Sequence, residues 1–134
     1  MTHLLDTHAW IQRAVGEPLP RLADQTLTRY AESLALADIS LWEAAKLVEL
    51  GRLELSIPLA EFFRLAIAPG LTVLPVTPAI AERVTALEAD GFHKDPADQL
   101  IVATALMHGL RLISNDTRIR QWGGVPTLWR TARR

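Results

Sequence analysis

Residues 95–114 read DPADQLIVATALMHGLRLIS, and they describe a helix followed directly by a strand. Asp is favoured at the N-cap, and proline at the first helical position is a common way to begin a helix, so Asp95-Pro96 marks the start. The pattern predicts a helix that runs to His108 and ends at Gly109, which can adopt the left-handed conformation of a C-terminal cap. Leu110–Ser114 is a short apolar run typical of a buried strand.

The same alternation of helix and strand continues along the rest of the chain. Short apolar runs predict strands at His3–Leu5, Leu34–Ile39 and Leu71–Val76, with an edge strand at Pro126–Trp129. Strands that alternate with helices predict an α/β fold with a mainly parallel central sheet. The helices expected between the strands are Thr7–Val15, Pro20–Ser33, one capped by Ser40 and running to about Leu50, Pro58–Ala68, Pro78–Asp90 and Asp116–Trp122.

The composition restricts the chemistry that the chain can perform. The 134 residues are 49% hydrophobic, so we expect one domain over residues 1–134 with a substantial core. The chain has no cysteine, which excludes a disulfide framework, thiol catalysis and a thiolate zinc site. Its first residues, MTHLLD, do not resemble a signal peptide, and no apolar run reaches the ~20 residues of a membrane span. A cytoplasmic protein is therefore expected.

The net charge of −1 does not by itself indicate a nucleic-acid partner, but the charge is unevenly distributed. From Arg111 to the end of the chain there are six arginines and one acid, Asp116. A basic tail of this kind is usually a solvated surface, and binding of nucleic acid or an acidic partner is the less common explanation.

Four acids occupy comparable places in the predicted elements. Asp6 and Asp116 follow predicted strands, while Glu43 and Asp98 lie in the first turns of predicted helices. In a parallel α/β sheet the carboxyl ends of the strands and the helix N-termini that follow them share one edge, where ligands bind. We therefore expect Asp6, Glu43 and Asp116 at that edge, joined by Asp98 if its helix begins there too.

Each acid also has a purely structural interpretation. Asp6 and Asp116 can cap the helices that follow them, Asp98 can complete a capping box, and Glu43 can pair with Lys46 one turn later. Asp95 is the strongest case of a structural cap. Taken together the structural interpretations are weaker, because carboxylates crowded at one edge repel each other and raise each other's pKa unless a cation joins them.

An all-oxygen site without cysteine favours Mg²⁺ or Mn²⁺ over zinc. His8 and His93 lie close in sequence to Asp6 and Asp95, but the spacing matches no zinc motif, and we expect all four histidines to be structural. Thr7, Ser40 and Ser114 are expected to cap helices or bond the local backbone, since no serine lies in a GxSxG turn. The chain also lacks a glycine-rich phosphate loop.

Four segments in order along the chain resemble the motifs of PIN domains, and the resemblance covers essentially the whole sequence. They are LLDTHAW at 4–10, SLWEAAK at 40–46, FHKDPADQLIVATA at 92–105 and LISND at 112–116. Each segment alone is weak evidence, whereas four in this order are specific. The compact length further resembles the VapC-like ribonuclease toxins of type II toxin–antitoxin systems.

The resemblance implies a three-layer α/β/α sandwich and hydrolysis of RNA by a water activated by Mg²⁺ or Mn²⁺. It places Asp6, Glu43, Asp98 and Asp116 at the acidic positions of the family site, with Asp6 and Asp98 as metal ligands. It also implies a homodimer held inactive by a small antitoxin protein. The apolar faces of Leu41–Leu50 and Pro58–Ala68 are candidate docking surfaces for that partner, although both can instead be ordinary core.

One residue departs from the family pattern, because many PIN domains carry Arg after the third acid and this chain has Gln99. A haloacid-dehalogenase-like phosphatase would need a second Asp where this chain has His8, and a receiver domain would need an acidic pair near the N-terminus. The remaining alternative is a catalytically inactive PIN-like module that binds RNA or protein.

Overall fold

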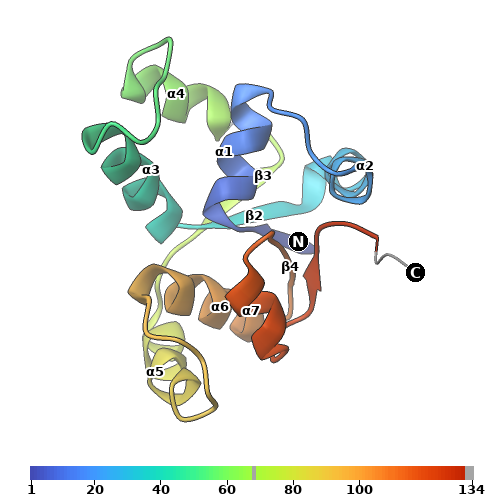
Figure 1. Cartoon of the computed structure of the whole chain (residues 1–134), viewed down its shortest axis with the longest axis vertical. Helices are drawn as coiled ribbons and strands as arrows, with labels where there is room; N and C mark the ends of the chain where they lie inside the picture. The colour runs from blue at the N-terminus through green and yellow to red at the C-terminus, as the bar shows by residue number, and fades with distance from the viewer. Residues whose placement is uncertain (68, 132–134) are drawn as a thin grey trace.

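A computed structural model describes residues 1–67 and 69–131 as alternating strands and helices (Figure 1). The chain begins with β1 and α1 and ends with α7 and the short strand β5. In order, the elements are β1 (His3–Leu5), α1 (Thr7–Val15), α2 (Arg21–Arg29), the 3-10 turn η1 (Ala31–Ser33), β2 (Leu34–Ala37), α3 (Ile39–Glu49), α4 (Leu59–Ala66), β3 (Leu71–Leu74), α5 (Pro78–Leu87), α6 (Pro96–His108), β4 (Arg111–Ile113), α7 (Thr117–Trp122) and β5 (Thr127–Leu128).

The five strands form one sheet in the order β3-β2-β1-β4-β5, and every pair is parallel. β1 lies at the centre, where Leu4 pairs with Ala35 of β2 and with Leu112 of β4. Along the chain, β2 and then β3 are added on one side of β1, and β4 and β5 are then added on the other side of β1. This reversal of strand order lies between β1 and β4, which is where open α/β sheets bind ligands at the carboxyl ends of their strands.

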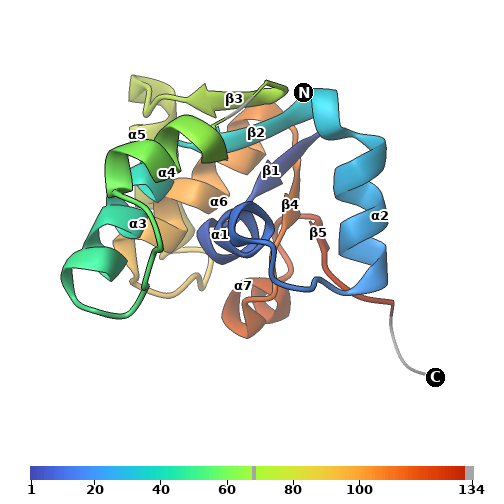
Figure 2. The same ribbon diagram turned by 90° about the horizontal axis from the view of Figure 1, so that it is seen from above.

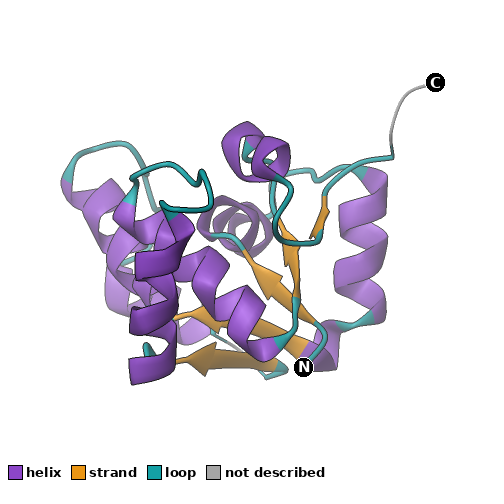
Figure 3. Ribbon diagram, turned by 90° about the horizontal axis from the view of Figure 1, so that it is seen from below, coloured by secondary structure: helices purple, strands orange, loops and turns teal. Residues whose placement is uncertain are grey.

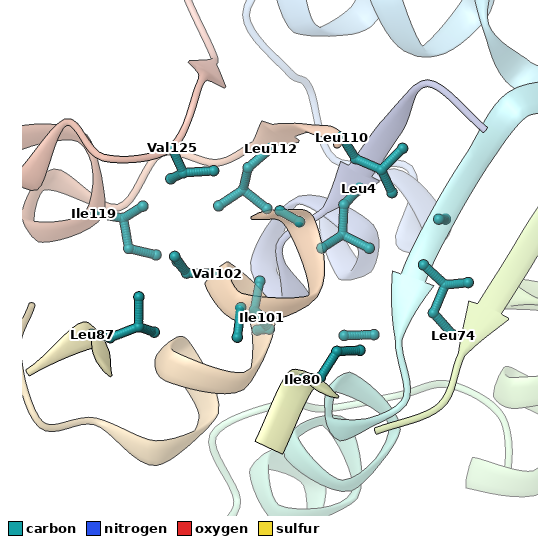
Figure 4. Close-up of a cluster of buried hydrophobic side chains, with 14 of the residues drawn as sticks. Leu4, Leu74, Ile80, Leu87, Ile101, Val102, Leu110, Leu112, Ile119 and Val125 are labelled. Carbon is teal, nitrogen blue, oxygen red and sulfur yellow. The ribbon is translucent and has the colours of Figure 1, made fainter. Parts of the chain in front are cut away.

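Helices cover both faces of the sheet, as the predicted three-layer arrangement requires (Figures 1 and 3). Successive residues of a strand point to opposite faces, so Leu4 and Leu5 belong to different cores. Leu4 packs with apolar residues of α5 and α6, including Ile80 and Ile101, in the core drawn in Figure 4. Leu5 packs with residues of α1, α2 and α4, namely Trp10, Leu27 and Phe62.

The helix predicted from residues 95–109 is confirmed at both ends. Asp95 accepts a hydrogen bond from the backbone N–H of Asp98 at 3.0 Å, and Pro96 is the first helical residue. Gly109 ends the helix with φ of 65°, and its N–H bonds carbonyls of the last turn. The edge strand expected at Pro126–Trp129 is also present as β5, although it is only two residues long.

Other boundaries differ from the prediction. The helix expected over Pro20–Ser33 ends at Arg29, because Tyr30 leaves the helical conformation and η1 follows. The strand expected over Leu34–Ile39 ends at Ala37, and α3 begins at Ile39, so Ser40 lies inside the helix and the capping prediction for it is wrong. The strand expected to reach Val76 ends at Leu74, and the helix expected to reach Asp90 ends at Leu87. Ala68, the expected last residue of α4, lies outside the described residues.

Asp38 explains the early end of β2. It takes a helical conformation at the N-cap position of α3, but its side chain does not cap that helix. Its carboxylate instead accepts a hydrogen bond from the backbone N–H of Val76 at 3.1 Å, beyond the end of β3. The turn after β2 is thus tied to the segment that follows the neighbouring strand, β3.

Within the described residues, no helix is both long and apolar enough to cross a membrane.

Candidate active site at the carboxyl edge of the sheet

Asp6 follows β1 and lies at the centre of the acidic edge. The residue is 4% exposed, and one carboxylate oxygen accepts the backbone N–H of Thr7 at 2.9 Å, so the predicted cap of α1 is present. The other oxygen accepts the hydroxyl of Ser114, which follows β4, at 2.6 Å. Burial raises the pKa of Asp6, and the Asp116 carboxylate adds to that rise, while His8 and the two hydrogen bonds oppose it.

Ser114 links two of the predicted acids. Besides donating to Asp6, its hydroxyl oxygen accepts the backbone N–H of Asp116 at 3.0 Å. This second contact is the local backbone bond expected of Ser114, and the first is a contact across 108 residues. Asp116 in turn caps α7 by accepting the N–H of Ile119 at 3.0 Å, as predicted, and it remains close enough to Asp6 to influence its pKa.

His8 also contacts this group. Its Nε2 accepts the backbone N–H of Asn115 at 2.9 Å, so in the neutral ring the proton is on Nδ1. Nδ1 lies 3.5 Å from the Asp6 carboxylate, and the ring packs edge-on against Trp129. His8 was expected to be structural, and the structure adds that it faces one of the site acids with an N–H.

Glu43 reaches the edge from α3. Its carboxylate accepts the hydroxyl of Thr7, whose oxygen lies 2.8 Å from the hydroxyl oxygen of Ser40. Because Thr7 has one proton to donate, Ser40 donates to Thr7 and Thr7 donates to Glu43. Thr7 and Ser40 therefore join α1 to α3, and the expectation that they cap helices or bond the local backbone is wrong.

The structural alternative for Glu43 is also wrong. Lys46 pairs with Glu49 at 3.1 Å, not with Glu43. Partial burial of Glu43 raises its pKa to about 6, and the nearby charges of Asp6 and Asp98 contribute to that rise. The carboxylate is thus held close to the other acids by neutral partners and has no cation beside it in the described part of the chain.

Asp98 completes the group from the first turn of α6. Its carboxylate lies 2.7 Å from Nε2 of His93, and the exposed guanidinium of Arg118 is 3.7 Å away. No bond to the backbone of Asp95 is seen, so the capping-box alternative is wrong, whereas Asp95 performs the capping as predicted. Burial raises the pKa of Asp98, and the charges of Asp95, Asp6 and Asp116 add to it.

Comparison with known proteins supports the resemblance seen in the motifs. Residues 3–125 match the family model described as PIN domain. The chain belongs to the PIN-domain family.

One relative and two solved structures illustrate the similarity of this PIN domain. It is 39% identical over 120 residues to ribonuclease VapC22 of Mycobacterium tuberculosis (strain ATCC 25618 / H37Rv), covering 89% of this chain and 90% of that protein. A toxin–antitoxin complex from Klebsiella pneumoniae contains a chain with 25% identity and a TM-score of 0.68, with 95% of this chain and 96% of that chain covered. VapBC2 of Rickettsia felis, solved bound to a promoter DNA fragment, matches at 17% identity with a TM-score of 0.70 and coverage of 96% and 99%.

Gln99, the departure from the usual PIN pattern, is buried. Its amide nitrogen donates to the Glu88 carboxylate and to the backbone carbonyl of His93, both at 3.1 Å. These bonds attach the loop between α5 and α6 to the helix that carries Asp98. The His93 ring, which touches Asp98, also packs against Phe92 with centroids 4.2 Å apart. His93 lies close in sequence to the site acids but was expected to be structural, and its contact with Asp98, five residues later, is a finding of the structure.

The donors at this edge are those of a hard cation. All four acids offer carboxylate oxygens as ligands. The pKa values of Asp6, Glu43 and Asp98 are raised by burial and, in part, by the charges of neighbouring acids. Among the described residues, no three His, Asp or Glu side chains lie close enough to enclose an ion by themselves. Mg²⁺ in proteins commonly uses one or two carboxylates and several waters, so this arrangement suits a largely hydrated ion.

The raised pKa of Glu43, caused first by burial and then by the charges of the neighbouring acids of this PIN site, leads to a prediction for stability. Because the pKa of Glu43 is raised to about 6, the folded protein binds this proton more tightly than the unfolded chain, whose value is near 4.5. Stability of the metal-free protein should therefore fall as pH rises through that window. Glu43→Gln keeps the acceptor for Thr7 and removes the charge, so it should raise the Tm in EDTA above pH 6 and lose this advantage below pH 4.5.

The measurement is thermal unfolding in EDTA between pH 4 and 8, with Glu54→Gln as the matched control. Glu54 is an exposed glutamate outside the acidic edge, and its substitution should shift the Tm little at any pH. A lower Tm for Glu43→Gln at neutral pH, or a gain of equal size at every pH, would contradict the raised pKa of Glu43.

Proposed function

We propose that this PIN-domain chain is an endoribonuclease that hydrolyses RNA phosphodiester bonds with Mg²⁺ or Mn²⁺, and that it is the toxin of a toxin–antitoxin pair. The observation that supports the chemistry is the convergence of Asp6, Glu43, Asp98 and Asp116 at one edge of the sheet. The 39%-identical relative is a ribonuclease, which supports RNA as the substrate. Because all four acids are present, we favour the active enzyme over a PIN-like module that only binds RNA or protein.

In this proposal Asp6 and Asp98 hold the metal through their carboxylate oxygens. The bound ion would lower the pKa of a water and balance the charge that develops on the phosphate. Hydrogen bonds from Thr7 N–H and Ser114 fix the two oxygens of Asp6, and His93 fixes one oxygen of Asp98. Fixed ligands favour catalysis because little reorganisation is then needed when the substrate arrives.

Glu43 and Asp116 have supporting roles. With a pKa near 6, Glu43 is largely ionised at neutral pH yet basic enough to orient the attacking water or take up its proton. Thr7, which donates to Glu43, sets the direction of that carboxylate. Asp116 is held at the N-terminus of α7 by its cap and contributes charge to the site.

We expect the purified chain to cleave RNA in Mg²⁺ or Mn²⁺ and to lose at least about a hundredfold in rate in EDTA. Without a cation, the carboxylates cannot balance the negative charge that develops on the phosphate in the transition state. The measurement is cleavage of a fluorescently labelled RNA in each metal, in EDTA, and after Mg²⁺ is restored. A preparation of Asp98→Asn made in parallel controls for contaminating ribonucleases. Full activity in EDTA would contradict the metal mechanism.

The proposed partner is a small antitoxin, and we also propose that the chain forms a homodimer. Most apolar residues of α3 and α4, the two helices named as docking surfaces, pack into the core with Leu5, so those inner faces are unavailable. Three large apolar side chains remain on the outside: Trp42 and Leu50, in and just after α3, and Leu65 in α4, each more than half exposed. An apolar stripe on a partner can pack against these exposed side chains.

A further inference from the structure

A groove lies at the edge of the sheet opposite the acids. It is lined by α2, the start of β1, the end of α6 with the turn that leads to β4, and β5 with the residue before it, and its volume is about 720 Å³. His3 begins β1 and Arg111 begins β4, whereas Asp6 and Ser114 follow the ends of these strands. The groove is therefore separated from the candidate active site by the length of the strands. Figure 2 shows α2 beyond β4 and β5 at this side of the molecule.

The charge of the groove is opposite to that of the acidic edge. None of the described residues that line it is acidic, and two of them are the arginines Arg29 and Arg111. Both arginines are exposed, and neither forms an ion pair with any residue in the described part of the chain. Two guanidinium groups that line one groove, with no carboxylate among its described lining residues, favour an anion, and a phosphate in particular.

The wall beside the arginines is flat and aromatic. The rings of His3 and Tyr30 lie 4.8 Å apart, and the guanidinium of Arg29 lies 5.3 Å from the centre of the Tyr30 ring. Thr2 donates its hydroxyl proton to the Ser33 carbonyl, so His3 Nδ1 donates to Thr2, and Nε2 of the neutral ring is an acceptor. Burial and the nearby Arg111 lower the pKa of His3, which keeps the ring neutral at physiological pH.

The remaining lining combines an apolar floor with several polar groups. The amide of Gln25, the hydroxyl of Tyr30 and Nε2 of His3 form no hydrogen bond with the residues that the structure describes. The volume lies within the ~300–1,000 Å³ usual for small-molecule sites, which are mostly apolar with a few polar groups that orient the ligand. The floor consists of Leu22, Ala105, Leu106, Leu110, Pro126 and Leu128.

We propose that this groove binds a phosphorylated nucleoside, with the phosphate at Arg29 and Arg111 and the base on the apolar floor beside His3 and Tyr30. Guanidinium groups bind phosphate through paired hydrogen bonds, and bases pack on aromatic rings and guanidinium planes. Gln25 and His3 supply a donor and acceptors for the polar edge of the base. The ligand is either a free mononucleotide or the phosphorylated end of an RNA chain, which share this chemistry.

The chain contains a single tyrosine, Tyr30, which makes the groove directly observable. Protein labelled with 3-fluorotyrosine gives one ¹⁹F signal, and titration with each of the four 5′-mononucleotides should shift that signal saturably. EDTA is present throughout, so that no metal at the acidic edge can hold the phosphate. Adenosine and inorganic phosphate, each lacking half of the ligand, should bind at least about tenfold more weakly than AMP, since each loses one set of contacts.

Arg29→Gln and Arg111→Gln should each weaken binding of the best mononucleotide about tenfold, the effect of losing one charge-assisted contact. Arg52→Gln, which removes an exposed arginine outside the groove, is the matched control and should leave the affinity unchanged. Because the substituted residues are exposed, all three variants should retain the parent Tm. The proposal is overturned if no nucleotide gives saturable shifts up to about 5 mM, if adenosine binds as well as AMP, or if the two groove variants bind like the parent.

A cleavage-resistant 2′-O-methyl trinucleotide with a 5′-phosphate distinguishes the two sources. Tighter binding of the trinucleotide than of the mononucleotide identifies an RNA end as the ligand, and equal or weaker binding identifies a free nucleotide. Either outcome supports binding in the groove if Arg111→Gln weakens the binding of the preferred ligand. Repeating the titration with Asp98→Asn separates this proposal from the nuclease proposal. Nucleotide binding should persist there, and its loss would show that the acidic edge, not the groove, holds the ligand.

Discussion

Asp6→Asn and Asp98→Asn are each expected to lower kcat/KM for RNA cleavage by about a thousandfold while the protein stays folded. Each substitution keeps the size of the side chain and removes the charge of a proposed metal ligand. Asp6→Asn can keep the cap of α1, because asparagine also caps helices well. The readouts are cleavage kinetics on a labelled RNA, Tm, and Mn²⁺ binding followed by electron paramagnetic resonance, which reports the metal site without requiring activity.

Asp95→Asn is the matched control for this prediction. Asp95 lies three residues before Asp98 on the same helix start, is exposed, and caps α6 through a contact that asparagine can replace. It should retain most of the activity and of the Mn²⁺ affinity. If Asp95→Asn were as damaging as Asp98→Asn with an unchanged Tm, the division between cap and ligand would be wrong. If neither affected cleavage, the acidic edge would not be the catalytic site.

The second large effect is expected from the proposed antitoxin. A chain co-purified with the product of its neighbouring reading frame should cleave RNA at least about a hundredfold more slowly than the free chain, because a bound partner blocks the site by mass action. The acidic edge is crowded with carboxylates, and among the described residues the exposed Arg118 is the one arginine or lysine close to Asp98, so the edge should attract an arginine from the partner. Arginine suits this role because its guanidinium pairs with carboxylates through two hydrogen bonds.

Removing the partner's C-terminal segment should restore cleavage, while a truncation of equal length at its N-terminus should leave the complex inactive. Trp42→Ser and Leu65→Ser test the docking surface, since both side chains are exposed and their loss should weaken the complex without lowering the activity of the free chain. Equal cleavage with and without the C-terminal segment would exclude this mode of inhibition and leave the nuclease proposal intact.

Local sequence patterns predicted the elements well where several signals agreed. Over residues 95–109 the N-cap, the proline, the apolar run and the glycine all indicate one helix, and the structure has it at those positions. One prediction that rested on a single signal was wrong. Ser40 is a good N-cap type, yet α3 begins before it, because the turn at Asp38 is tied to the connection after β3 by a contact 38 residues away.

The sequence by itself determined the α/β class, the strands, and the placement of Asp6, Glu43, Asp98 and Asp116 at strand ends and helix starts, because these depend on periodicity and capping over a few residues. Only the tertiary structure decided what each acid touches. Thr7 meets Glu43 and Ser40 because α1 packs on α3, and Ser114 meets Asp6 because β4 pairs with β1. The raised pKa values and the basic groove opposite the acids arise in the same way, since burial and the approach of distant charges exist only once the sheet brings remote segments together.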